Sequence, residues 1–436
     1  MFPGIMRGGT SRGKHQNMTG EVTPEVTHNN TTHRAAFAHY LVSSSLWMAG
    51  MSLYGFLFTW LLIGILDRPA DEAGFARLIA EMPPLALLLL GGVLGDRMNG
   101  RTYLVIMHLA MVVPPLLIAV VYSSGLISYL WVVLFGVLTA SIQSLSDPAR
   151  QAALSRVSHL DIQRSITVMT IVTTGIGMFG FWLGGHLEEF GLSEVLLIQA
   201  LLFLAGVFSV RKLPDLPAPQ SKRPSLAEGL RATWTNALAR NLIGLNFLSS
   251  LFNAGAYIIA IPYIVKEVYG GDASLLASIM IVFTCGSVGS NILLYWWMPL
   301  LRPGRLFLHM QLSRIIILGA LFFGPPLWLF YVLLFCWGLN MGITTTMVRS
   351  TVQEVAPANY RAQILSVLLL SFMVSSPVSS YVLGQVIEAF DPLAALLPGV
   401  VISVLIFWLG VRYSGLWTWE SPALSLQSDA SSPASR

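Results

Sequence analysis

Charged side chains are rare in this chain, and three of them stand together in the run from Gly92 to Arg101. Asp96, Arg97 and Arg101 occupy a short, glycine-containing turn between two long apolar segments. Such a turn is typical of a loop in a polytopic membrane protein, because charges remain hydrated only near the membrane faces. Arg97 could pair with Asp147, which follows a later apolar segment; the alternative is that these charges only mark the topology.

Three further charged residues lie within apolar segments, where ionisable side chains are costly and are candidates for function. Glu81 precedes a Pro-Pro pair that should kink its helix, and Arg77 stands one turn before it, at a spacing that allows an ion pair. We expect either a structural pair or a proton-responsive carboxylate. Arg314 lies about 14 Å along its segment from Arg305, by the rise of an α-helix. There, near the membrane midplane, it could meet an anionic substrate or a helix end.

The chain carries no pattern typical of an enzyme. It contains no P-loop, HExxH, CxxC or triad spacing. Its two cysteines, Cys285 and Cys336, lie in apolar runs and are too few for a disulfide framework or a metal site. We therefore predict no catalytic residues, no cofactor and no metal.

Composition predicts an all-α polytopic membrane protein. Of the 436 residues, 55% are hydrophobic and 11% are charged, whereas a typical soluble domain has about 25% charged residues. A spanning helix needs about 20 mostly apolar residues. The chain offers twelve such segments, at 37–65, 74–94, 102–122, 126–146, 163–186, 192–210, 241–265, 273–298, 304–323, 326–347, 362–386 and 393–413.

The basic residues predict the orientation. Most of the 25 Lys and Arg residues fall in the tails and in the loops of one side, while acidic residues collect on the other. By the positive-inside rule, both termini are then cytoplasmic. Because the basic residues are spread over loops rather than gathered on one face, we exclude nucleic acid as a partner and expect membrane lipid.

The chain also divides into two halves. Residues 211–240, rich in proline and basic side chains, form a cytoplasmic linker whose part 225–240 could be an amphipathic helix on the membrane surface. The predicted units are a disordered tail at 1–36, a six-helix bundle at 37–210, a second bundle at 241–413 and a tail at 414–436.

An internal repeat relates the two bundles. Segment 183–191 aligns without a gap with 383–391, at an offset of 200, and the alignment includes Gly184 with Gly384. Both segments end the fifth span of their half. The match indicates two parallel repeats with a substrate site between them.

Several motifs resemble those of the major facilitator superfamily. The run 92–101 is similar to the G-x-L-a-D-r-x-G-r loop between helices 2 and 3 of that family. Residues 147–154, with Asp147 and Arg150, resemble a segment of the exporter branch that includes the enterobactin exporter and transmembrane secretion effectors. The fifth span resembles the antiporter signature G-P-x-x-G-G, with phenylalanine in place of proline. Its matching glycines are Gly180, Gly184 and Gly185. The loop after the eighth span departs from the family, because it has no acidic residue.

The resemblance implies alternating access between two halves. In the family, the 92–101 loop latches the halves in the outward-open state, with Asp96 facing the helix that starts near Arg361. The fifth-span glycines allow close helix packing, and a close contact with the eighth span could also seal the substrate path. Spans 1, 4, 7 and 10 line the family's cavity. Here, with Arg314, they offer the candidates Tyr40, Trp47, Tyr54, Gln143, Asn246, Asn253, Tyr257, Asn340 and Thr344.

We therefore predict an exporter of a small organic molecule, siderophore-like or drug-like, in a bacterial inner membrane. By resemblance, proton antiport drives it, with Glu81 as the coupling candidate, and it acts as a monomer. One alternative is an importer of a similar compound. Another is a sensor or assembly factor that transports nothing.

Overall fold

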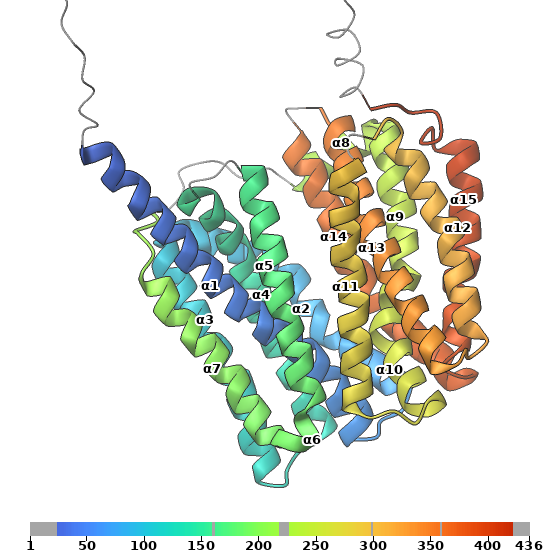
Figure 1. Ribbon diagram of the computed structural model, residues 1–436, viewed down its shortest axis with the longest axis horizontal. Coiled ribbons are helices and arrows are strands. Elements are labelled where there is room, and N and C mark those ends of the chain that lie inside the picture. Colours follow the sequence, from blue (N-terminus) through green and yellow to red (C-terminus); the bar gives the residue numbers. More distant parts are fainter. Residues whose placement is uncertain (1–23, 159–161, 218–225, 298–299, 358–359, 422–436) are drawn as a thin grey trace, which may run out of the picture.

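The computed structural model describes residues 24–158, 162–217, 226–297, 300–357 and 360–421, and within them it consists of helices joined by short connections (Figure 1). Eleven of its helical segments are long and apolar enough to cross a membrane. The remaining predicted span, 74–94, is also a helix, but its side chains over 88–96 are outside the described part. The all-α membrane architecture predicted from composition is therefore confirmed.

The first half contains the first six predicted spans. Their helices are α1 (Pro24–Trp60) with its π-helical extension η1 (Leu61–Ile65), α2 (Ala70–Arg97), α3 (Gly100–Ser123), α4 (Tyr129–Val157), α5 (Ile162–Gly185), the short α6 (Leu187–Phe190) and α7 (Leu192–Arg211). Close packing within this half rests on small residues: a side chain added at Gly136 of α4 would collide with Phe58 of α1 and Ala80 of α2.

The second half repeats this pattern after the linker helix α8 (Leu226–Thr235). The seventh span comprises α9 (Ala237–Gly255), η2 (Ala256–Ala260), α10 (Ile261–Tyr263) and η3 (Ile264–Val268). The others are α11 (Ala273–Trp297), α12 (Pro303–Phe322), α13 (Leu327–Val355), α14 (Arg361–Ala389), and η4 (Ala394–Leu396) with α15 (Leu397–Tyr413).

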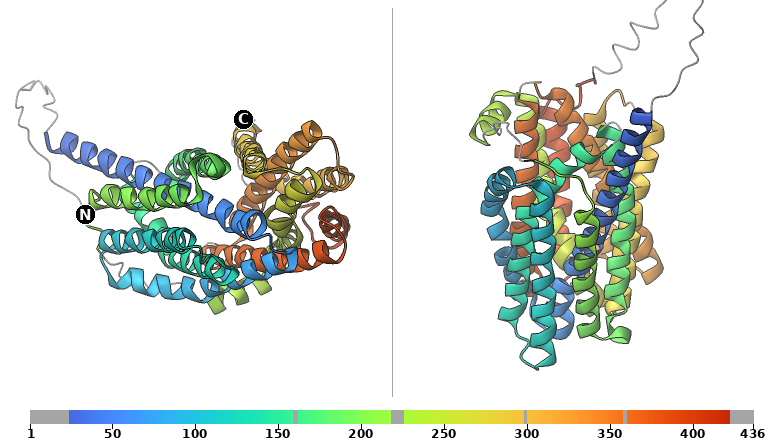
Figure 2. Two further views of the ribbon diagram at one scale, coloured as in Figure 1. Left: turned by 90° about the horizontal axis from the view of Figure 1, so that it is seen from below. Right: turned by 90° about the vertical axis from the view of Figure 1, so that its left-hand side faces the viewer.

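The helices of the two halves converge at one face and diverge toward the other (Figure 1). We call the face where α1 begins and α15 ends the termini face, at the top of Figure 1, and the other the opposite face. The halves form two groups when seen along the helices, and α2 lies beside α14 (Figure 2). The second cross-half pairing is α5 with α11.

Two predicted boundaries differ from the structure. Residues 24–36, predicted as part of a disordered tail, are helical, because α1 begins at Pro24; proline is well suited to the first turn of a helix. Residues 414–421, predicted as the start of the second tail, fold back on the termini face, where the backbone N–H of Ser421 donates to the carbonyl of Leu301 and Arg302 pairs with Glu420.

The predicted linker helix is shorter than expected. It ends at Thr235, because Asn236 leaves the helical conformation and its side chain caps α9 by accepting from the backbone N–H of Ala239. The linker helix α8 packs on α14, where Gly229 lies so close to Gln363 that an added Cβ would be 2.8 Å from its carbonyl oxygen.

Candidate functional site

The first and seventh spans join the two halves at the opposite face. Lys266 donates from Nζ to the carbonyl of Ile63 at 2.6 Å and forms an ion pair with Asp67. The hydroxyl of Tyr263 donates to the carbonyl of Arg68 at 2.7 Å. The hydrogen bond from Lys266 holds the pKa of the Asp67 carboxyl below its usual range. These contacts close the opposite face between the halves.

Both chain segments that make this closure have the same backbone geometry. Each ends in a π-helical turn, η1 or η3, followed by one residue with positive φ, Asp67 at 49° and Gly270 at 60°. Glycine adopts this conformation freely, while aspartate is one of the few other residues that tolerate it. The turn at Asp67 therefore combines a slightly unfavourable backbone with a carboxylate aimed at Lys266.

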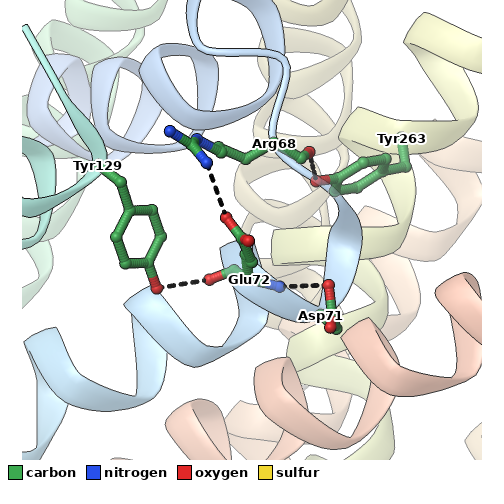
Figure 3. A network of polar contacts seen from close by, with 5 residues as sticks. All are labelled: Arg68, Asp71, Glu72, Tyr129 and Tyr263. Carbon is green, nitrogen blue, oxygen red and sulfur yellow. Dashed lines mark hydrogen bonds and ion pairs between the residues drawn. The ribbon is translucent and has the colours of Figure 1, made fainter.

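A polar network behind Asp67 fixes the start of α2 (Figure 3). Arg68 contacts Glu72 at 3.4 Å, and the backbone N–H of Glu72 donates to Asp71 at 2.7 Å. The hydroxyl of Tyr129 donates to the carbonyl of Glu72 at 3.0 Å. Because Tyr263 bonds the Arg68 carbonyl, the network links α4 and α2 of the first half to the seventh span (Figure 3).

Small residues make the two helix pairings between the halves. A Cβ on Gly185 at the end of α5 would lie 2.5 Å from that of Ala277 on α11, and Ser274 donates to the Gly185 carbonyl at 2.7 Å. In the pairing of α2 with α14, a Cβ added at Gly74 would lie 2.5 Å from the carbonyl oxygen of Ser380. Gly384 of α14 lies against Ala70. The aligned 183–191 and 383–391 segments thus provide both cross-half contacts.

The other two glycines of the antiporter-like signature pack inside their own half. An added Cβ at Gly180 would collide with the backbone of Ala49 and Leu53 in α1, and one at Gly184 with the ring of Phe56. Only Gly185 of the three contacts the eighth span, which is α11. The glycine motif therefore packs α5 against α1 as much as against the second half.

The charged motif lies at the termini face. Arg101 forms an ion pair with Asp215 at 2.7 Å and donates to the Leu213 carbonyl. These bonds connect the start of α3 to the segment that follows α7. Gly92 and Asp96 fall in the stretch 88–96 of α2, whose side chains are outside the described residues. Arg97 is exposed.

The predicted Arg97–Asp147 ion pair is not formed among the side chains that the structure describes. The cation acting on Asp147 is Arg150, one helical turn away on α4. The reason is geometric: Arg97 is the last residue of α2 and points into solvent, while Asp147 is half-buried within α4.

Arg150 belongs to a buried cluster in the first half. Its guanidinium lies 4.5 Å from the ring centre of Trp47, and the hydroxyl of Tyr40 donates to its backbone carbonyl at 2.6 Å. Trp47 also packs against His108, at 4.8 Å between ring centres, and against Phe203, at 5.5 Å. His108 contacts Ser43 at 3.2 Å. Tyr40 and Trp47, predicted to line a cavity, are thus buried in packing contacts.

The predicted Arg77–Glu81 pair is formed, at 2.5 Å between Nε and Oε1. Both side chains are mostly buried, at 14% and 20% exposure. Arg77 also lies over the ring of Phe58 at 5.5 Å, and Tyr54 is the neighbouring polar group, donating weakly to the Gly136 carbonyl at 3.4 Å. The first half thus holds two groups of buried ionisable side chains, this one and the one around Arg150.

Arg314 organises the polar centre of the second half. Its Nε and Nη2 donate to Asn340 Oδ1 at 3.1 and 2.8 Å, and its Nη1 donates to Ser249 Oγ at 2.5 Å. It lines a small pocket with Asn246, Ser249, Ser250, Asn253, Met341, Thr344, Thr345 and Phe372. Five predicted cavity residues therefore come together: Asn246, Asn253, Asn340, Thr344 and Arg314.

Two other cavity candidates lie outside this pocket. Tyr257 stacks on Phe283 at 4.1 Å between ring centres and is edge-on to Trp337. Gln143 is half-buried on α4. The aromatic cluster of Tyr257, Phe283 and Trp337 is therefore not part of the pocket lining.

Sequence reasoning missed the closing residues Asp67, Tyr263 and Lys266. A signal was present, because Lys266 is one of very few cations among the acidic loops of its side. Ser249, which contacts Arg314, carried no such signal: a single serine in an apolar span usually bonds a carbonyl of its own helix.

The fold and these motifs define a transporter of the major facilitator type. The sequence profile of the Major Facilitator Superfamily matches residues 40–380, so the chain belongs to this superfamily. A sequence search of curated proteins finds no significant match.

Solved structures share the fold at low sequence identity. A variant of the nucleoside transporter NupG is 14% identical, with a TM-score of 0.71 over 87% of this chain and 99% of that one. A bacterial homologue of the human lysosomal transporter Spinster, inward-facing and unoccupied, is 16% identical, with a TM-score of 0.64 over 92% and 99% of the chains. A D-xylose–proton symporter is 12% identical, with a TM-score of 0.65 over 85% and 96%.

Proposed function

We propose that the protein is a proton-coupled secondary transporter that exports a small organic molecule by alternating access. The observation that carries this proposal is the one-sided closure: Lys266, Tyr263 and the Gly185–Ala277 contact join the halves at the opposite face. The helices diverge toward the termini face (Figure 1). With the basic loops and both termini in the cytoplasm, this is an inward-open state, ready to load from the cell.

The coupling carboxylate in this proposal is Glu81. It is the acidic residue of the Arg77–Glu81 pair, and it lies beside the first-half aromatic residues Tyr54 and Phe58. Protonation of Glu81 would release Arg77 and change the charge of the first half. A local change of this size can shift a two-state equilibrium, because the minor state needs a gap of only a few kcal/mol.

Export rather than import rests on resemblance. The Asp147–Arg150 segment is similar to that of exporters that release siderophores and drug-like compounds, and the cargo is of that class in this proposal. Import of a similar compound is the second candidate, since the fold permits either direction. A sensor that transports nothing is the third.

Flux in proteoliposomes with an imposed pH gradient tests the proposal. We expect inverted vesicles, with an acidic lumen, to accumulate at least one labelled siderophore-like or drug-like compound, and Glu81→Gln to abolish the accumulation. Glu194→Gln, at an exposed residue of α7, is the matched control and should transport normally. Accumulation only in right-side-out vesicles would favour the importer. If no compound showed flux that depends on the pH gradient, the result would contradict proton-coupled transport and favour the sensor.

A further inference from the structure

The second half buries a cation without an acidic partner. Arg314 is 1% exposed in the middle of α12. Its guanidinium donates only to neutral acceptors, on Ser249, Gln311, Asn340 and Thr344. None of the ion pairs in the described part of the chain includes it. Hydrogen bonds to neutral groups satisfy the N–H groups but leave the full positive charge in a region where an unpaired charge is costly.

The pocket beside Arg314 presents further donors. Asn246 is 2% exposed and lines the pocket, and its Nδ2 amide has no hydrogen-bond partner among the described residues. The hydroxyl of Ser250 lines the same space, while that of Thr345 already donates to the carbonyl of Met341 at 2.9 Å. An unpaired buried donor is uncommon in proteins and indicates a missing partner. Asn246 Nδ2 requires an acceptor, as Arg314 does, while Asn253 Oδ1 of the same pocket is an acceptor that has no donor among the described residues.

The remaining wall is apolar. Met341 of α13 and Phe372 of α14 line the same pocket as the polar groups. A few convergent polar groups set against apolar side chains are typical of a site for an organic ligand. A bare inorganic ion would leave the surfaces of Met341 and Phe372 without contact.

We propose that this pocket binds the carboxylate of a small organic acid with an apolar or aromatic body, and that such acids are the cargo. This inference rests on the proposed transport function. The planar guanidinium of Arg314 matches a carboxylate in charge and geometry, and Asn246 Nδ2 supplies an additional donor. The carboxylate also neutralises the buried charge. Cationic compounds are excluded, because they would add a second positive charge beside Arg314.

Binding to the purified full chain in detergent tests the proposal. The probes are benzoate and 1-naphthoate, each compared with its isosteric amide, and the readout is the thermal unfolding midpoint as a function of ligand concentration. Loss of the charge-assisted hydrogen bonds weakens binding by about tenfold to hundredfold. We therefore expect the carboxylates to stabilise the protein at concentrations lower by that factor than the amides. Equal behaviour of acid and amide for both pairs would overturn the proposal.

Two variants keep the test independent of folding. Asn246→Asp preserves size and places a carboxylate beside Arg314, which gains a counter-ion; we expect a folded protein that no longer responds to either acid. Arg305→Gln removes a charge from the same helix at the termini face and should respond like the wild type. An unchanged response of Asn246→Asp would overturn the proposal.

The binding test is separable from transport, because it needs no gradient. Selective carboxylate binding without any pH-driven flux would contradict the transport function but support carboxylate binding in the pocket. Flux of neutral compounds without carboxylate selectivity would contradict carboxylate binding in the pocket but support the transport function.

Discussion

Lys266 and Ile63 stand 203 residues apart at equivalent places in the two halves, and the ammonium of one donates to the carbonyl of the other at 2.6 Å. Each lies in a π-helical turn, in η3 and η1 respectively. A π-turn leaves carbonyls displaced from the regular α-helical pattern, and such turns often lie at functional sites. Here the π-helical turn η1 of the first span accepts a hydrogen bond from the equivalent turn η3 of the seventh span. The opposite face is therefore closed by two elements that occupy equivalent places in the two halves.

Replacing Lys266 with methionine should open that face. The change removes the bond to the Ile63 carbonyl and the ion pair with Asp67 while keeping most of the side-chain volume. Because hydrogen bonds from charged groups contribute about 1.5–3 kcal/mol, the population of the state that is open at this face should rise about tenfold or more. Spin labels at the exposed Glu189 and Asp272 report the separation by electron resonance, after replacement of Cys285 and Cys336 with serine.

Lys212→Met, an exposed change at the other face, is the control for Lys266→Met. It should leave the distance distribution as it is in the wild type. An unchanged distribution in Lys266→Met would show that the closure does not depend on this residue.

The closure should weaken in acid through Asp67. The Lys266 bond lowers the pKa of this carboxyl in the closed state, so its contribution is fully present above the ordinary carboxyl value of about 3.9. It is lost as the pH falls through the lowered value. We expect the labels at 189 and 272 to separate as the pH is brought below about 4. Asp67→Asn should show the weakened closure at neutral pH, with no further change over this range.

Steric substitutions at the cross-half glycines should also disturb the closure. Alanine at Gly185 places a Cβ 2.5 Å from that of Ala277, and neither atom can rotate away, so α5 and α11 must separate. Gly175→Ala on the same helix meets nothing within 4 Å and is the matched control. It should keep the closed distance and raise the unfolding midpoint, because alanine is favoured over glycine within a helix by about 0.5–1 kcal/mol. Equal effects of both changes would argue against a specific α5–α11 contact.

The Arg77–Glu81 pair allows its structural and coupling roles to be separated. Glu81→Gln leaves the mostly buried Arg77 without a counter-ion and should lower stability by about 1–3 kcal/mol. The double change Arg77→Met with Glu81→Leu removes both charges and should recover most of that stability. If Glu81 carries protons, the stable double variant still lacks pH-driven flux. Recovery of flux together with stability would assign the pair a structural role only.

Much of the fold was predictable from the sequence, because the membrane imposes strong local rules. Apolar runs of spanning length predicted the helices, and the Arg77–Glu81 pair followed from their spacing on one helical face. The repeat that aligns Gly184 with Gly384 predicted the division into two halves, while the contacts across them are made by Gly185 and Gly384. The start of α1 at Pro24 was missed, because residues 24–36 are polar and composition alone does not distinguish such a helix from a tail.

The functional contacts depended on tertiary structure. The sequence alone determined a two-half membrane transporter fold, the positions of its intramembrane charges and the asymmetry of its loops, since each of these depends on residue type and local spacing. Only the assembled helices decided that Asp147 neighbours Arg150 rather than Arg97, that Lys266 closes one face on Asp67, and that Arg314 meets Ser249 and Asn340 without an acid. The contacts of Lys266 and Arg314 join residues tens to hundreds of positions apart, so they depend on how helices cross and rotate, which no single segment specifies. Arg150 stands only three residues from Asp147 on the same helix, and what the fold decided there is that Arg97 forms no ion pair with Asp147 among the described side chains.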